Sequence, residues 1–133
     1  MIPLSYAQRR LWFLNRLEGP SATYNVPVVL RLDGVPDPVV LAAALRDVVE
    51  RHESLRTVLP AGPDGEPHQQ VRAAGQPVDF AAVECGPGGV DAAVRTFAHM
   101  PFDISCELPL RVRLFTAPDT ACPVLVLLLH HVA

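Results

Sequence analysis

Residues 123–131 read Pro123-Val124-Leu125-Val126-Leu127-Leu128-Leu129-His130-His131, and the rest of the chain has to accommodate this segment. Six apolar residues in a row predict a strand that is covered on both faces, because a half-exposed strand would alternate with polar residues. The strand carries two adjacent histidines at its carboxyl end. We therefore expect a layered fold in which this strand delivers His130 and His131 to one end of a sheet.

Three segments before this strand have the apolar spacing of helices. The first begins with Ser5-Tyr6-Ala7-Gln8, which has the form of a capping box. Its core face is predicted to contain Ala7, Leu11, Leu14 and Leu17. The second helix is predicted for residues 37–53, with His52 continuing its apolar face, and the third for residues 90–97.

Strands are predicted for residues 24–32, 55–59, 68–72, 78–83 and 110–115, in addition to 124–129. The first of them alternates, with Tyr24, Val26, Val28, Leu30 and Leu32 on one side, and residues 110–115 alternate with Arg111 and Arg113. The Pro- and Gly-rich residues 60–67 are typical of a hairpin-like loop. The expected fold class is mixed α/β (α+β), with residues 1–133 forming a single domain.

The composition narrows the possible functions. With 133 residues, 50% of them hydrophobic and 19% charged, the chain suits one globular core. A net charge of -3 and an aromatic content of 6% argue against nucleic-acid binding. The longest apolar run is far below the ~20 residues that cross a bilayer. Because no secretory signal is visible either, we expect a cytoplasmic protein.

The cysteines and histidines do not indicate a metal site. Cys85, Cys106 and Cys122 are odd in number, are widely spaced and lack a CxxC pair, which argues against a disulfide framework and a zinc site. His130 and His131 have no Asp, Glu or Cys at ligand spacing nearby. We therefore expect no bound metal.

Three motifs carry a family resemblance. Residues 3–14, Pro3-Leu4-Ser5-Tyr6-Ala7-Gln8-Arg9-Arg10-Leu11-Trp12-Phe13-Leu14, resemble the first core motif of condensation domains of non-ribosomal peptide synthetases, S-x-A-Q-x-R-L-W-x-L. Arg51-His52-Glu53-Ser54-Leu55-Arg56-Thr57 is similar to the second, R-H-E-x-L-R-T, and His130-His131 matches the start of the third, H-H-x-x-x-D-G. Tyr24-Asn25-Val26-Pro27, Pro101-Phe102-Asp103 and Pro109-Leu110-Arg111 also resemble stretches usual in the family.

The resemblance implies a chloramphenicol-acetyltransferase-like half with a mixed sheet and packed helices. Residues 1–133 would be most of the amino-terminal subdomain of a condensation domain, truncated before the Asp and Gly of the third motif. The implied reaction joins a donor acyl or peptidyl thioester to an acceptor aminoacyl thioester through an amide bond. Both substrates arrive on phosphopantetheine arms of carrier proteins, so no cofactor is bound directly. The implied partners are donor and acceptor carrier proteins, the second half of the domain and neighbouring synthetase domains, in bacterial antibiotic or other secondary metabolism.

The resemblance also assigns roles to four residues. His131 is the implied catalytic residue, and a neutral imidazole can accept a proton from the attacking amine or orient it. His130 is expected to be its structural partner, because adjacent residues of an extended segment point to opposite sides. Arg51 and Arg56 are expected to support the helix-to-strand junction through an ion-pair network with Glu53, with a solvated charge cluster as the alternative. The first motif is expected to be structural.

Other functions remain open at this point. A non-catalytic condensation-like module would recruit a tailoring enzyme or dock carrier proteins, and an epimerisation domain shares the fold and the histidine motif. In the family the active site lies in a tunnel between two halves, so the isolated chain is expected to be inactive. Surface that the second half normally covers would favour a homodimer or poor solubility.

Overall fold

Helices and strands are interspersed along the chain, and the computed structural model describes all residues from 1 to 133. The elements are β1 (Ile2–Pro3), α1 (Tyr6–Glu18), β2 (Asn25–Arg31), α2 (Pro38–Arg51), a 3₁₀ helix (Glu53–Arg56), β3 (Thr57–Val58), β4 (His68–Val71), β5 (Asp79–Glu84), α3 (Val90–Ala98), β6 (Leu110–Thr116) and β7 (Val124–His130). None of the helices is both long enough and apolar enough to cross a membrane.

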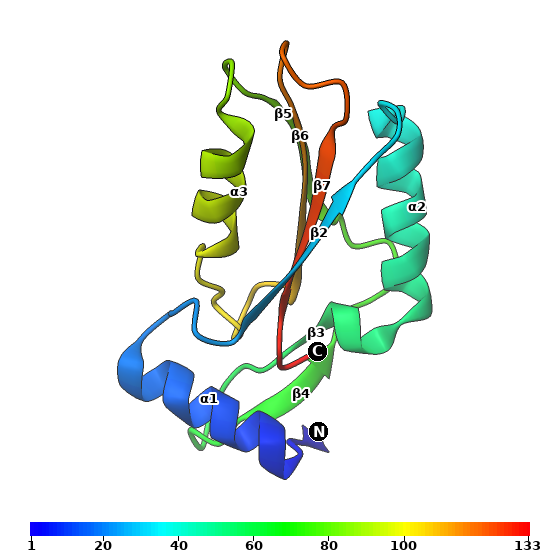
Figure 1. Ribbon diagram of the computed structural model, residues 1–133. Coiled ribbons are helices and arrows are strands. Elements are labelled where there is room, and N and C mark those ends of the chain that lie inside the picture. The colour runs from blue at the N-terminus through cyan, green and yellow to red at the C-terminus, as the bar shows by residue number, and fades with distance from the viewer.

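The main sheet has four strands in the order β2-β7-β6-β5. β7 is antiparallel to both of its neighbours, whereas β5 and β6 run parallel, so the sheet is mixed. Helices α2 and α3 cover opposite faces of this sheet (Figure 1). Alternate residues of β7 pack toward each helix, with Val126 in the α3 core and Leu125 in the α2 core. The prediction that this strand is covered on both faces is therefore confirmed.

A smaller sheet, in the order β1-β4-β3, lies with α1 at the end of the main sheet where β7 finishes (Figure 1). Two side-chain hydrogen bonds attach α1 to this region. The Gln8 Nε2 donates to Gln69 Oε1 at 3.3 Å, and the Trp12 indole N–H donates to the Leu59 carbonyl at 3.1 Å. This attachment holds α1 beside the end of β7.

Several local expectations were wrong. The predicted core face of the first helix ends early, because Leu17 is 70% exposed in the last turn of α1. His52 is exposed because α2 stops at Arg51 and His52 is its cap. The strand expected at residues 55–59 is shorter than predicted, because Leu55 and Arg56 belong to the 3₁₀ helix and β3 contains only Thr57 and Val58. β1 was not predicted.

The side of β2 that carries the predicted alternation is not buried. Val26, Val28 and Leu30 are exposed, although their alternation was correctly expected to form a strand. β2 is an edge strand of the main sheet, and the core residues of α2 pack against β6 and β7 instead. The alternation therefore predicted the strand correctly, but it did not show whether other residues of the chain pack over that side.

Replacing Ser5 with alanine is expected to destabilise the chain by about 1 kcal/mol. The capping box is present: the Ser5 hydroxyl accepts from the Gln8 N–H at 3.2 Å, and the Ser5 N–H donates to Gln8 Oε1 at 2.9 Å. Urea unfolding measures the loss. Ser54→Ala is a matched control, because Ser54 is also exposed but caps nothing. Equal midpoints for the two variants would show that the box does not contribute.

Candidate functional site

The two histidines lie where β7 ends and a turn begins. The backbone N–H of His130 donates to the Pro109 carbonyl at 3.1 Å, and that of His131 donates to the Tyr24 carbonyl at 2.9 Å. These bonds attach the strand end to the segments on either side of it. His130 is only 2% exposed, whereas His131 is exposed. The two side chains therefore have different surroundings, as expected for neighbours on an extended segment.

The His130 ring is packed among aromatic side chains. Its centroid lies 5.9 Å from that of Phe102, in an edge-on arrangement, and 6.5 Å from that of Tyr24. Its Nδ1 accepts a hydrogen bond from the Val132 N–H at 3.2 Å. Burial, and to a lesser extent the neighbouring His131, lower the pKa of His130 to about 4. At neutral pH the ring is therefore uncharged, carries its proton on Nε2 and can keep Nδ1 as an acceptor.

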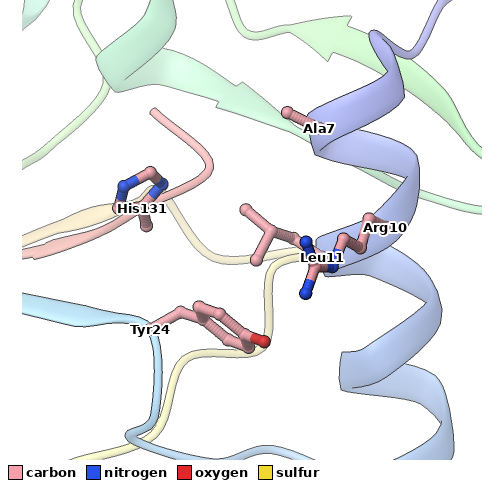
Figure 2. Close-up of a pocket in the computed structure, with 5 residues that line it drawn as sticks. All are labelled: Ala7, Arg10, Leu11, Tyr24 and His131. Carbon is pink, nitrogen blue, oxygen red and sulfur yellow. The ribbon is translucent and has the colours of Figure 1, made fainter.

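His131 borders a mostly apolar cavity of about 250 Å³. The other lining residues are Ala7, Arg10 and Leu11 of α1 and Tyr24, which precedes β2. In Figure 2, α1 forms one wall and presents Leu11 and Arg10 toward the side where Tyr24 and His131 lie. The pocket thus combines an accessible imidazole, a guanidinium and a phenol with apolar walls.

Three residues of the first motif, which is expected to be structural, also line this pocket. Ala7, Arg10 and Leu11 are spaced by three and four residues, so they lie on one side of α1. The sequence contained this spacing, but the same spacing also describes a core face. Tyr24 was assigned to a strand face and to a stretch usual in the family, and nothing local indicated its place beside His131.

The side chains of Arg51 and Arg56 differ in burial and in ion pairing. The Arg56 side chain is mostly buried, with Nη2 3.1 Å from Glu53 Oε1 and Nη1 donating to the Arg72 carbonyl at 2.6 Å. Arg51 is exposed at the end of α2 and makes no ion pair. The expected network therefore contains Arg56 and Glu53 but not Arg51, because the helix ends with the Arg51 side chain in solvent. Neither arginine lines the His131 pocket.

Comparison with protein-family models assigns the chain to a family. The family model for the condensation domain matches residues 1–133. The chain belongs to the condensation domain family. The resemblance carried by the three motifs is thereby confirmed.

Relatives of known name are much longer. The chain is 47% identical over 134 residues to the nonribosomal peptide synthetase CymA of Salinispora arenicola, covering 99% of the chain and 2% of CymA. It is 47% identical over 136 residues to the isonitrile lipopeptide synthase of Mycobacterium tuberculosis, covering 99% and 5%. It is 44% identical over 133 residues to a dimodular nonribosomal peptide synthase of Bacillus subtilis, covering 98% and 6%. The chain thus spans only a small part of each of these proteins.

Solved structures give the same fold. The X-domain from teicoplanin biosynthesis superposes with a TM-score of 0.83 at 34% identity, covering 98% of this chain and 28% of that one. The first condensation domain of the CDA synthetase superposes with a TM-score of 0.80 at 21% identity, covering 98% and 35%. The predicted chloramphenicol-acetyltransferase-like fold is thus confirmed, and the chain spans about a third of these structures.

Proposed function

We propose that this chain is most of the amino-terminal subdomain of a condensation domain that forms an amide bond between two carrier-bound thioesters. The observation that carries the proposal is the exposed imidazole of His131, at the end of a buried strand, in a pocket walled by the first motif of the family. Membership of the condensation family supports the reaction class.

The proposed reaction is the attack of the acceptor α-amine on the carbonyl carbon of the donor thioester. A C–N bond forms, the C–S bond breaks, and the donor thiol leaves with a proton. A free α-amine has a pKa of about 8 and is largely protonated at neutral pH, so the amine must be held in its neutral form. In this proposal His131 accepts the amine proton or orients the amine, and holding two tethered reactants together contributes further to the rate.

The remaining half of the active site is proposed to come from the second subdomain. The chain covers 28% to 35% of the solved structures named above, which supports this division. Exposed apolar side chains of β2 and α2, including Val28, Val29, Val39 and Val40, are consistent with a surface that further protein covers. We propose that the chain alone is inactive and tends to self-associate. In the same proposal, donor and acceptor carrier proteins are the partners of the domain, and the protein is cytoplasmic.

A recruitment module is the competing function. The X-domain from teicoplanin biosynthesis, to which the chain is similar, has been solved in a complex with OxyB. A module that only recruits a partner has no need of an accessible imidazole in a cavity. The open environment of His131 therefore supports catalysis over recruitment.

Intact-protein mass spectrometry tests the proposal. The complete condensation domain, given loaded donor and acceptor carrier proteins, is expected to transfer the donor acyl group to the acceptor. The 133-residue chain at the same concentration is expected to give no product, because in this proposal the second subdomain supplies the rest of the active site. Circular dichroism checks that both proteins are folded. If the complete domain transfers no acyl group from several donor stereoisomers on active carriers, the recruitment function is supported instead.

A further inference from the structure

Phe102 connects the buried histidine to a charged cluster. It lies in the loop between α3 and β6 and is completely buried. The His130 ring meets it edge-on, with the centroids 5.9 Å apart. The guanidinium carbon of Arg111 lies 4.3 Å from the centroid of the same phenyl ring. The position of Phe102 therefore determines the space available to the His130 ring.

Arg111 is itself held on two sides. Its side chain is only 9% exposed, with Nη2 2.8 Å from Glu107 Oε2 and Nε 3.5 Å from Asp79 Oδ2. The same Glu107 oxygen accepts the backbone N–H of Asp103 at 2.7 Å. Because Asp103 directly follows Phe102, one carboxylate oxygen ties Arg111 to the loop that carries the phenyl ring.

Burying an arginine in a protein core opposes folding. Desolvating a guanidinium opposes folding, and apolar residues often replace a buried ion pair without loss of stability. Here the Arg111 Nη1 is also buried without a partner, which adds to the cost. The guanidinium is a planar cation, so it can stack on a ring and bind a carboxylate at the same time, which an apolar residue cannot do.

We propose that Arg111 and Glu107 form a clamp that fixes Phe102 against His130 and thereby sets the turn that presents His131. His130 closes that turn through its Nδ1, which accepts the Val132 N–H, and through its carbonyl, which accepts the Ala133 N–H at 3.1 Å. Arg111 is then a positioning residue for His131. This inference rests on the proposed amide-forming function.

Arg113 provides an internal control. It lies two residues along β6, on the same face as Arg111, and its Nη1 is 2.8 Å from Asp79 Oδ1. Its guanidinium carbon lies 5.1 Å from the centroid of the Phe97 ring. Phe97 packs against Phe115, not against a histidine. Arg113 therefore has the same kinds of contact but touches neither Phe102 nor Glu107, and it shares only Asp79 with Arg111.

The test compares Arg111→Met with Arg113→Met in the complete condensation domain. Arg111→Met is expected to lower kcat for acyl transfer on the order of tenfold, because His131 is misplaced, with KM for the acceptor carrier protein unchanged. Arg113→Met is expected to stay close to wild type. Glu107→Ala provides a second route if Arg111→Met does not fold, because Glu107 is partly exposed and its loss disturbs the core less. Glu107→Gln keeps an acceptor oxygen and is expected to retain more activity than Glu107→Ala.

Nuclear magnetic resonance gives a readout that does not need activity. In Arg111→Met, or in Glu107→Ala, the ring signals of His130 and the amide signal of Val132 are expected to shift, and the pKa of His130 is expected to rise from about 4 as water reaches the ring. Arg113→Met is expected to leave these signals in place. Unchanged His130 and Val132 signals in both clamp variants, or equal losses of kcat in the two arginine variants, would overturn the clamp. If the wild-type domain forms no amide, the proposed function fails, and the resonance data alone decide whether the clamp exists.

Discussion

Replacing His131 with alanine in the complete condensation domain is expected to lower the rate of amide formation by roughly 10²- to 10⁴-fold. The imidazole is the group in the pocket that can take a proton from the amine at neutral pH. Because His131 is exposed, its removal leaves no cavity in the core, and the thermal unfolding midpoint is expected to stay unchanged. Single-turnover transfer between loaded carrier proteins, followed by intact-protein mass spectrometry, measures the loss.

His99→Ala is the matched control for this experiment. His99 is also exposed, but it follows α3 and does not line the pocket. The control is expected to transfer at the wild-type rate. A rate for His131→Ala within a few-fold of the control would exclude His131 from proton transfer and from positioning of the amine. The pocket would then have to act through Tyr24 or Arg10, the other polar side chains that line it.

The sequence predicted the site best where the signal was local. The apolar run of β7 defines both the covered strand and the place where the histidines emerge, and the capping box marks the start of α1. The helix face with Ala7, Arg10 and Leu11 could not be assigned in the same way. Its spacing is compatible with a core or with a pocket wall, and only the packing of α1 beside the end of β7 distinguishes them.

Arg111 shows the limit of local pattern reading. Alternation in residues 110–115 suggested a strand with a polar side, yet Arg111 is buried on that side. The reason is that the loop between α3 and β6 folds over the strand and supplies Phe102 and Glu107 as partners. Such burial depends on where a loop goes, and strand periodicity carries no information about it.

Acid is expected to destabilise the condensation domain through His130. Its pKa is about 4 in the folded state, against 6.5 for an ordinary histidine, because burial disfavours the charged ring. Below pH 6.5 the unfolded chain therefore binds more protons than the folded one. The contribution of His130 to the free energy of unfolding is complete above that pH and is lost as the pH falls to about 4. A shift of this size corresponds to about 3 kcal/mol of unfolding free energy, of which about 2 kcal/mol is lost by pH 5.

Urea unfolding at several pH values between 8 and 4 compares wild type with His130→Phe. The variant has no ring to protonate, so its stability is expected to fall less on acidification, even if it starts lower at pH 8 because Val132 loses its acceptor. His131→Gln is expected to keep most of the wild-type pH dependence, because burial is the larger cause of the shift and the His131 charge the smaller one. If the free energy of unfolding depends on pH in the same way for wild type and His130→Phe, the His130 ring is already solvated in the folded protein. Since Nδ1 can accept the Val132 N–H only while it is unprotonated, the acid that weakens the fold also releases the turn that presents His131.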